Sequence, residues 1–566
     1  MHEVALSASG LLREFAEAGM ISVADHHLAM SLARHFDTPD EVVLAFALAA
    51  RELRQGSVYV PLRTASELAP LSEIDDGQDV EPVELRWPEP ESWIEAVAGS
   101  RLVGEGRAFM LDDDRLYLAR FWRTEQQVRS ALLERKQLPT VQAVPEGALP
   151  PGTKPDEQQE QAVSAALTHM TSVITGGPGT GKTTTVVRIL NALGAHTPVA
   201  VALAAPTGRA ARQLEDSVDG RLAKGAVTEL FAGTLHKLLG LRVRATTGKY
   251  HRDNPLPYDV VVLDETSMVS LEHMAALLDA LAPTTRLILV GDPHQLRSVE
   301  AGAVLADIVE NPALTQPGSV VRLGTNRRSN SEINALAAAI DIGAIDEAVS
   351  IIEEASTIEF IDYEGRGAER LPSLAADLVE QSDRLLSAAR SGDVKAALDA
   401  LGHHRILCAH RVGAFGVQEW AKVARSVIAA RHTDYGGEEP YVGQPLLITR
   451  NTEPFSNGDV GVVVNVGGHL RAAIDQGGGS EPVIVSPALL DDAADLHAMT
   501  IHKSQGGQYE TVSVVLPPVG SPLATRELLY TAVTRAKTKL RLYGSEEALR
   551  TAIATPVRRA SGLASS

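Results

Sequence analysis

Residues 171–193 read TSVITGGPGTGKTTTVVRILNAL, a short apolar segment followed by a glycine-rich loop and a helical stretch. The loop fits the pattern G-x-x-x-x-G-K-[ST] in full, in the strand–loop–helix context that this motif requires. Glycines let backbone N–H groups curl around phosphates, and the helix start adds partial positive charge. We therefore predict a nucleotide site formed by Gly176, Gly177, Pro178, Gly179, Thr180, Gly181, Lys182, Thr183 and Thr184.

A second apolar strand supplies the acidic residues that such a site needs. The run VVVLDE at 260–265 ends in Asp264, which with the Thr183 hydroxyl is expected to ligate Mg²⁺. Glu265 follows one residue later and is expected to align or deprotonate water. Lys182 should reach the β- and γ-phosphates. These residues predict an enzyme that hydrolyses ATP with Mg²⁺ as its metal.

Glutamines are expected to make the remaining nucleotide contacts. Gln295 follows the apolar strand in the run LILVGDPHQL (287–296), where it can hydrogen-bond the γ-phosphate or the attacking water. Gln159 stands in PDEQQEQAV, upstream of the loop, and its amide has both the donor and the acceptor that match the adenine edge. Gln158 and Gln161 stand beside it, and the pattern leaves the choice among the three open.

The 566 residues suggest roughly four domains at about 150 residues each. A single cysteine, Cys408, excludes a disulfide framework and a cysteine-ligated zinc or iron–sulfur site. There is no run of 18 apolar residues and no basic region at the amino terminus, so we expect a cytoplasmic protein. The formal net charge of −20 counts modestly against a nucleic-acid partner, although a positive groove can sit inside an acidic molecule.

Apolar, β-branched runs alternate with helical stretches beyond residue 155, which predicts parallel sheets covered by helices. Two such series occur in tandem, the second including HRILCAH, PLLITRN, TVSVVLP and KLRLYG. Helical spacing dominates the first 145 residues. The fold class is therefore α/β, with two tandem P-loop-type domains, a mostly helical N-terminal domain and small β inserts.

Composition shifts set the expected domain boundaries. The expected units are an N-terminal domain at 1–145, a linker at 146–155, a first α/β domain at 156–322 with a β-hairpin at 236–256 turning at Thr247-Gly248, a second α/β domain at 323–440 and 499–555, a small SH3-like β-barrel insert at 441–498, and a disordered tail at 556–566.

Eight segments in register resemble the motifs of superfamily I DNA helicases, and in particular the RecD subunits of bacterial RecBCD, also called exonuclease V. They are GGPGTGKT (176–183), APTGRAA (205–211) with GTLHKLLG (233–240), VVLDETSMV (261–269), LVGDPHQLRSVEAG (289–302), LGTNRRSN (323–330), SNGDVGVVVN (456–465), MTIHKSQGGQY (499–509) and LLYTAVTRAK (528–537). DHHLAMSLARHF (25–36) is similar to the N-terminal domain of that family.

The resemblance implies two RecA-like domains with ATP between them. Arg328 and Arg535 would then be arginine fingers that reach the γ-phosphate from the second domain and tie hydrolysis to domain movement. One position departs from the family pattern, because Arg327 stands where many members carry a tyrosine that stacks on adenine. A guanidinium plane can also stack on a base.

The resemblance also implies DNA repair and recombination through 5′-to-3′ translocation along DNA, with contacts to duplex ends and single strand, and assembly with RecB and RecC chiefly through the N-terminal domain. The expected DNA contacts are small polar and basic residues in loops, suited to phosphates and sugars more than to base edges. They are Thr207, Arg209, Thr234, His236, Asn457, Thr500, His502, Lys503 and Gln505. Aromatic residues make up only 4%, which favours tracking of the backbone without sequence preference.

Four alternatives remain open: a stand-alone RecD-like helicase, a regulatory subunit that binds ATP with little motor activity, an RNA helicase, and a nuclease. The nuclease interpretation rests on Asp114 with Glu134 and Lys136, which imitate a metal-dependent nuclease spacing. Glu134 and Lys136 fall in an expected helix, where residues i and i+2 do not share a face. We therefore expect no nuclease site in this chain.

Overall fold

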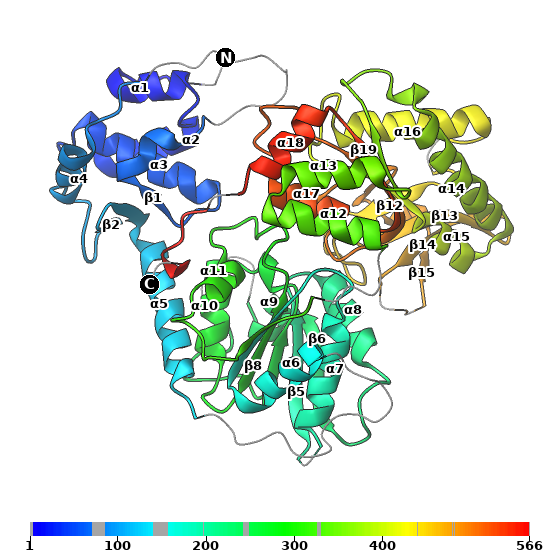
Figure 1. Ribbon diagram of the computed structural model, residues 1–566, viewed down its shortest axis with the longest axis horizontal. Coiled ribbons are helices and arrows are strands. Elements are labelled where there is room, and N and C mark those ends of the chain that lie inside the picture. Colours follow the sequence, from blue (N-terminus) through cyan, green and yellow to red (C-terminus); the bar gives the residue numbers. More distant parts are fainter. Residues whose placement is uncertain are drawn as a thin grey trace.

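The computed structural model describes residues 4–70, 85–139, 157–195, 197–241, 248–324, 330–437, 440–477, 479, 481–557 and 559–564. These residues form an N-terminal domain, a first α/β domain and a second α/β domain, which lie at the upper left, bottom and upper right of Figure 1. None of the helices in these ranges has both the length and the apolarity to cross a lipid bilayer.

The first α/β domain is built on a six-stranded parallel sheet in the order β6-β5-β7-β8-β4-β9. Its inner strands are buried on both faces, as continuous apolar runs require. The strands are β4 (Thr171–Thr175), β5 (Val199–Ala205), β6 (Val227–Thr234), β7 (Val260–Leu263), β8 (Arg286–Gly291) and β9 (Val320–Arg322), and the helices are α6 (Glu157–Thr168), α7 (Lys182–Leu193), α8 (Gly208–Val218), α9 (Leu235–Leu239), α10 (Leu271–Ala280) and α11 (Val304–Glu310).

The second α/β domain has a five-stranded parallel sheet in the order β10-β19-β18-β11-β17. Its strands are β10 (Ile358–Ile361), β11 (His404–Cys408), β17 (Ala498–Thr500), β18 (Tyr509–Val515) and β19 (Ala536–Tyr543), and its helices are α12 (Ser331–Ile342), α13 (Ile345–Glu354), α14 (Pro372–Ser391), α15 (Val394–Leu401), α16 (Val417–Arg431), α17 (Arg526–Val533) and α18 (Glu546–Ala554). The expected pair of tandem α/β units is therefore present.

The β insert of the second domain is an open antiparallel sheet in the order β15-β14-β13-β12-β16. It comprises β12 (Pro445–Ile448), β13 (Val460–Val466), β14 (His469–Asp475), β15 (Val483–Val485) and β16 (Ala493–Asp495). The expected closed barrel at 441–498 is wrong for the described residues, because the two edge strands do not pair. One face of the sheet is instead buried by α14 and α15, where Val462 and Val464 pack with Leu385 and Ala397. Because α14 and α15 bury this face, the sheet does not have to close into a barrel.

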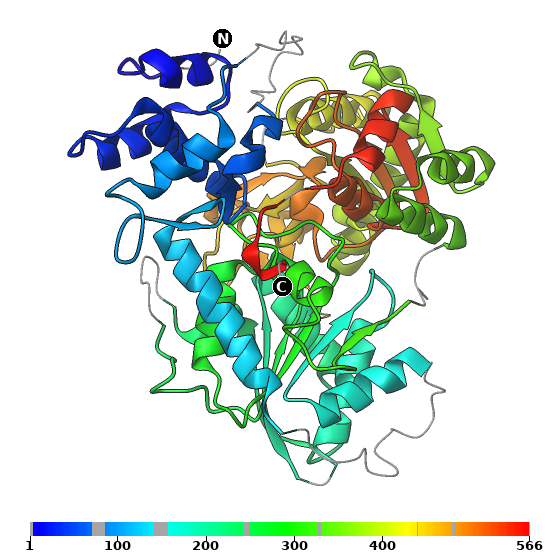
Figure 2. The same cartoon turned by 60° about the vertical axis from the view of Figure 1, so that its left-hand side comes forward.

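The N-terminal domain combines helices with a small antiparallel sheet in the order β1-β3-β2. Its elements are α1 (Gly10–Glu17), α2 (Val23–Ala33), α3 (Asp40–Arg54), β1 (Tyr59–Pro61), α4 (Pro90–Ala98), β2 (Phe109–Asp112), β3 (Arg115–Leu118) and α5 (Ala119–Lys136). Helix α5 leaves this domain and runs along the first α/β domain (Figure 2). Arg135 on α5 donates to the Met170 and Thr285 carbonyls at 2.8 and 2.7 Å. The expected linker at 146–155 lies outside the described residues.

The expected β-hairpin at 236–256 is wrong in its first arm, which is helix α9. Thr234 caps that helix by accepting the Lys237 backbone N–H at 3.2 Å, and Gly240 ends it with a positive φ of 63°. The apolar residues after Thr234 recur at helical spacing, at i, i+3 and i+4, and all three are buried. Thr247, in the expected turn, lies outside the described residues.

The chain after α18 is packed, so the expected disordered tail at 556–566 is wrong for the described residues. We call residues 555–564 the C-terminal segment. It runs from the second α/β domain to the junction of the other two (Figure 1). Leu563 is fully buried in the core cluster of the first α/β domain, and the Ser561 hydroxyl donates to Asp307 Oδ2 at 2.7 Å. A single leucine is enough to dock this segment, although its neighbours are small, because Leu563 enters an apolar site between α5 and α11.

Candidate nucleotide and nucleic-acid site

The glycine-rich loop joins β4 to α7 and curls as its pattern predicts. Gly181 begins α7 with a positive φ of 88°, and a Cβ there would lie 2.8 Å from the Gln159 amide nitrogen. Thr180 braces the loop by donating from its hydroxyl to the Gly177 carbonyl at 2.9 Å. Only glycine combines this backbone conformation with so close a neighbour. The loop is therefore shaped to surround an anion.

The Lys182 ammonium lies in the mouth of this loop. Its Nζ donates to the carbonyl oxygens of Gly176 and Gly177 at 2.6 and 3.1 Å. Both acceptors are neutral carbonyl oxygens, and phosphate oxygens are stronger partners for an ammonium because they carry negative charge. The cation is thus held ready for a triphosphate.

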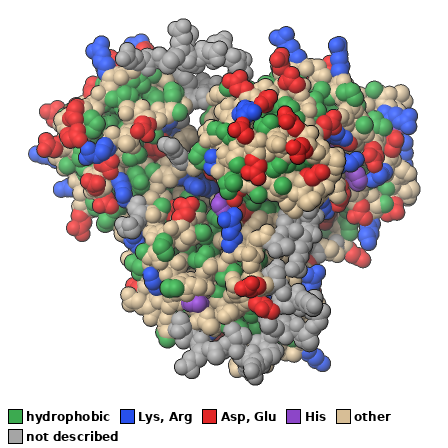
Figure 3. Space-filling view, in the orientation of Figure 1, with side chains coloured by type: hydrophobic (Ala, Val, Ile, Leu, Met, Phe, Trp, Pro, Cys, Tyr) green, Lys and Arg blue, Asp and Glu red, His purple; other side chains and the backbone are tan. Residues whose placement is uncertain are grey.

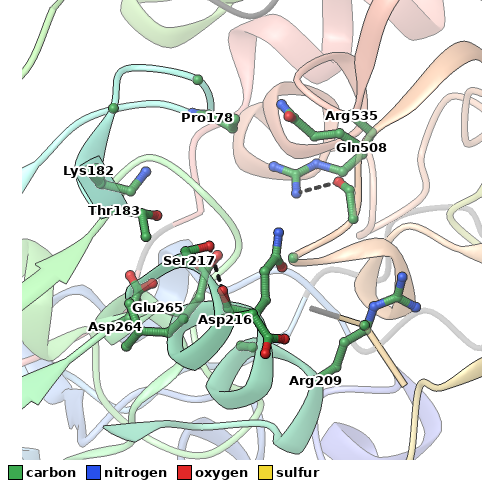
Figure 4. Close-up of a pocket in the computed structure, with 18 of the residues that line it drawn as sticks. Pro178, Lys182, Thr183, Arg209, Asp216, Ser217, Asp264, Glu265, Gln508 and Arg535 are labelled. Atoms are coloured by element: carbon green, nitrogen blue, oxygen red, sulfur yellow. Dashed lines mark hydrogen bonds between the residues drawn. The ribbon is translucent and has the colours of Figure 1, made fainter. Parts of the chain in front are cut away.

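Asp264 and Glu265 lie across the cavity from the loop, at the end of β7 (Figure 4). Strand β8 lies between β7 and β4, so the acidic strand is the next but one to the P-loop strand and not its neighbour. Glu265 has a positive φ of 49°, a strained conformation for a residue with a side chain. Burial and then the Glu265 charge raise the pKa of Asp264 to about 6, while Lys182 opposes the shift.

The donors at this end of the cavity suit a hard cation that keeps its own water and phosphate ligands. Thr183 and Asp264 both line the cavity, and each offers a single oxygen-bearing group. No group of three or more His, Cys, Asp or Glu side chains that could hold a metal occurs among the described residues. An Mg²⁺ ion that arrives with the nucleotide fits this donor set better than a cation bound by the protein alone.

Gln295 reaches the same cavity from the loop after β8, and the second domain holds it there. Its Nε2 donates to Asp292 Oδ2 at 3.0 Å, and its buried Oε1 has no hydrogen-bond partner in the described part of the chain. Asp292 Oδ2 also accepts the Tyr530 hydroxyl of α17 at 3.1 Å. The unpartnered oxygen of Gln295 is therefore free to orient a water or accept from a bound one.

Arg535 projects into this cavity from the second α/β domain, opposite Lys182 (Figure 4). Its guanidinium is buried and donates to the Thr531 and Gly507 carbonyls at 3.0 and 3.1 Å. Burial lowers its pKa, although the charges of Glu265 and Asp292 favour its charged form. The cavity has a volume of about 570 Å³, within the range of a small-ligand site.

The two other expected arginines, Arg327 and Arg328, lie outside the described residues. Among the adenine candidates, Gln159 is the one that lies against the loop, and it accepts from Arg188 Nη1 at 3.0 Å. Gln158 accepts the Gly324 backbone N–H at 2.6 Å, and Gln161 donates to Glu157 at 3.3 Å. Of the three, the geometry supports Gln159.

The expected DNA contacts fall into two groups. Thr207, Arg209 and Asn457 meet where α8 approaches the β insert, and Arg209 Nη1 donates to the Gly458 carbonyl at 3.0 Å. Arg209 also lines the nucleotide cavity, so it lies between the two sites. Asn457 itself is exposed.

The second group lies along the facing edges of the two α/β domains. Its members are Thr234 and His236 at the start of α9 and Thr500, His502, Lys503 and Gln505 after β17. His236 packs edge-on against His273 with ring centroids 4.5 Å apart. Burial and the nearby Arg411 lower the pKa of His502 and of Lys503. Gln505 donates to the Leu296 carbonyl of the first domain at 3.1 Å, which is a contact between lobes.

Acidic side chains are spread over all three bodies on the face that Figure 3 shows, as the net charge of −20 requires. On this face the Lys and Arg side chains lie scattered among the acidic ones.

Three contributors to the site were missed from the sequence: Asp292, Tyr530 and Arg212. Asp292 and Tyr530 stand inside the motifs LVGDPHQL and LLYTAVTRAK, so a partner for the Gln295 amide could have been sought there. Arg212 lies just after APTGRAA and carries no pattern that predicts its contact with the insert.

Three family models match parts of the chain: an AAA domain over 154–363, the N-terminal domain of RecBCD enzyme subunit RecD over 17–117, and a UvrD-like helicase C-terminal domain over 495–543. The chain is similar to RecBCD enzyme subunit RecD of Mycobacterium tuberculosis, with 43% identity over 99% of this chain and 97% of that one. It is 43% identical to the RecD subunit of Mycolicibacterium smegmatis over 98% of each chain.

A more distant relative is the ATP-dependent RecD2 DNA helicase of Deinococcus radiodurans, 30% identical over 88% of this chain and 61% of its own length. Among solved structures, the crystal structure of Bacteroides Pif1 bound to single-stranded DNA covers 70% of this chain and 94% of its own, with 16% identity and a TM-score of 0.40.

Proposed function

The chain belongs to the family of the RecBCD enzyme subunit RecD, and from that membership we propose that it is the 5′-to-3′ DNA motor of a complex that processes double-strand breaks for repair and recombination. As a RecD subunit it is an ATP-dependent DNA helicase, and its partners are RecB and RecC. We place it in the cytoplasm, with the DNA ends on which such a complex acts.

One observation carries the proposal: Lys182 of the first α/β domain and Arg535 of the second line the same cavity. A triphosphate held by the loop would put its γ-phosphate between the two cations. We assign the stabilisation of developing charge to Arg535 and the orientation of water to Glu265 and Gln295. Because Arg535 belongs to the other lobe, hydrolysis depends on how closely the lobes approach.

We assign Mg²⁺ to Thr183 and Asp264, which would hold the ion, and the ion would supply positive charge to offset that of the phosphates. We assign adenine recognition to Gln159, and Arg327 is a further candidate for it. We propose Arg328 as a second arginine finger, and this assignment rests only on its position in the family's motif. The N-terminal domain, with no group in the nucleotide cavity, is proposed as the surface that binds the partner subunits.

We assign single-strand contacts to the polar and basic residues of the facing edges. Two sets of such contacts, one on each lobe, allow alternate grip and release as the cleft opens and closes. The assigned residues are Thr207, Arg209, Thr234, His236, Asn457, Thr500, His502, Lys503 and Gln505.

The test is the ATPase rate of the purified chain with and without single-stranded DNA, repeated with RecB and RecC present. We expect DNA to raise the rate, and RNA of the same length to raise it much less. A rate that RNA raises equally would contradict the DNA assignment. Strand displacement by the chain alone would favour a stand-alone helicase over a subunit.

A further inference from the structure

Helix α8 of the first domain and the turn 456–459 of the insert are joined by two arginines one helical turn apart. Arg212 donates from Nη1 to the Ser456 hydroxyl at 3.0 Å and from Nε to the Gln476 carbonyl at 2.8 Å, and its Nη2 pairs with Asp459. Arg209 donates to the Gly458 carbonyl at 3.0 Å. A single side chain, Arg212, thus bonds both ends of the turn and the residue that follows β14.

Because the Asp459 carboxylate is buried, we expect the bonds between α8 and the turn to form and break together. The Asp459 side chain is 0% exposed, and burial raises its pKa. Its bonded partners are the Ser456 backbone N–H at 2.7 Å, within the turn, and Arg212, on the other lobe. A buried carboxylate that loses its cation is strongly disfavoured. Separation of α8 from the turn therefore breaks the whole set of bonds together.

The approach of the two lobes at this point is too close for any larger residue at the start of α8. A Cβ on Gly208 would lie 2.6 Å from the Ser456 hydroxyl oxygen. Thr207 precedes this glycine, and Asn457 follows the serine. The pairing of Arg212 with Asp459 therefore brings two proposed strand contacts, one from each lobe, side by side.

The same helix and insert form a wall of the nucleotide cavity. Arg209 and Asp216 of α8 and Asp475 and Gly477 of the insert line it, together with Lys182. Arg212 is not among the lining residues. It bonds the turn without lining the cavity, so its effect on the reaction is exerted through the position of the insert.

We propose that Arg212 is a positioning residue that couples the nucleotide cavity to the grip on single-stranded DNA, by latching the turn 456–459 onto α8. The proposal rests on the helicase function above. We call the bonds from Arg212 to the turn the latch. While the latch is closed, both lobes contact the single-stranded DNA at this point. When the cleft changes with the nucleotide, the latch opens and the contact from the insert is withdrawn.

The test measures the dissociation constant for a single-stranded oligonucleotide in ADP and in a non-hydrolysable ATP analogue, with the full chain assembled with RecB and RecC. Allosteric couplings are commonly 5- to 150-fold, so we expect the wild-type ratio of the two constants to fall in about that range. Arg212→Ala should reduce the ratio to about twofold or less, with unchanged affinity for the analogue and an unchanged melting temperature. A ratio that stays near the wild-type value overturns the proposal.

Three further variants separate positioning from a general loss of structure. Arg212→Lys keeps the charge and should restore part of the ratio. Asp459→Asn removes the ion pair and should give a large part of the loss seen in Arg212→Ala, and the double variant should be no worse than Arg212→Ala, because the loss of Arg212 already includes that pair. Arg390→Ala breaks an ion pair with Asp434 within the second domain and should leave the ratio unchanged. An equal loss in Arg390→Ala, or additive losses in the double variant, would refute the latch.

The proposed strand contacts are tested independently by Asn457→Ala. This variant should weaken DNA binding in the nucleotide state in which both lobes contact the strand, have little effect in the other state, and so lower the ratio. If Asn457→Ala binds DNA as the wild type does, the assignment of Asn457 fails, while the ratio in Arg212→Ala still decides the latch.

Discussion

The proposed roles of Lys182 and Arg535 in ATP hydrolysis require that the two side chains face each other across the cavity. Each is held by backbone carbonyl oxygens, and each is bound to a different lobe. A cation held by neutral acceptors is oriented in advance and has little to rearrange when charge develops in front of it. We therefore expect the arrangement to stabilise the transition state only when the lobes are together.

Arg535→Ala should lower the DNA-stimulated kcat for ATP hydrolysis by about 10³-fold, the scale of an arginine finger, with a much smaller change in nucleotide affinity. Steady-state kinetics and nucleotide titration measure the two effects separately. Arg535→Lys serves as a second variant, because it keeps a cation in the buried site and guards against loss by unfolding. Full activity in both variants would exclude Arg535 as a finger.

Asp307 makes the docking of the C-terminal segment depend on pH. Burial raises the pKa of Asp307 to about 6 from 3.8, and burial also raises the pKa of Glu125, which accepts the Gly562 backbone N–H at 2.8 Å. A raised folded-state pKa means that the stabilisation is complete below about pH 4 and lost as the pH rises through 6. The shift of about two units is worth about 3 kcal/mol at most.

We therefore expect protection of the segment from hydrogen exchange, corrected for intrinsic rates, to fall between about pH 4 and pH 7 and to change little above that. Asp307→Asn cannot titrate and should flatten this dependence, leaving the part due to Glu125. An Asp307→Asn profile with the same slope as the wild type would show that another group is responsible.

At the scale of elements, the C-terminal segment ties three bodies together. Val58 donates its backbone N–H to the Ala560 carbonyl at 2.7 Å, and Asn311 Nδ2 donates to the Leu563 carbonyl at 2.7 Å. Leu563 belongs to the same buried apolar cluster as Tyr117 and Phe121. The segment thus connects the second α/β domain to both others without a helix or strand across the gap.

Leu563→Ala should destabilise this junction by about 2–5 kcal/mol, since it removes a fully buried leucine and leaves a cavity. Denaturant midpoints with exchange measured on α5 and α11 would localise the loss. Val519→Ala provides the matched control, because Val519 is 47% exposed and should cost little. Equal stability of Leu563→Ala and the control would mean that the segment contributes nothing to the junction.

At the scale of the whole molecule, the assembly decides whether this motor contributes to unwinding. Lys182→Gln keeps a polar side chain, one atom shorter, but removes the cation that we assign to the phosphates. We expect the complex with RecB and RecC to form normally and to unwind DNA more slowly, with nearly all ATPase activity of this chain lost. Unwinding at the wild-type rate would instead favour a regulatory subunit that binds ATP without driving movement.

Much of the site could be read from local pattern. The loop, the Asp264 and Glu265 pair and Gln295 each follow an apolar strand in a short motif, and parallel strands deliver their carboxyl ends to one edge. Gln159 could not be separated from Gln158 and Gln161 by sequence, because the choice depends on which amide faces the loop. Arg212 was missed because its partners are more than 240 positions away.

The sequence predicted the strands well where both faces of a strand are buried. It predicted an element poorly where a segment far away in the sequence buries it. A barrel was expected because the insert is rich in short strands, but α14 and α15 cover it. A disordered tail was expected because small and polar residues dominate it, but Leu563 finds a prepared apolar site.

The sequence by itself determined the nucleotide chemistry and the family of this chain, since both depend on residues adjacent along the backbone or on the order of motifs. Only the tertiary structure decided how the lobes are joined: which side chains cross the cleft, where the C-terminal segment docks, and why Arg212 matters. The physical reason is that local patterns set the conformation of a segment. Contacts between lobes depend on shapes and charges that meet only after every segment has packed.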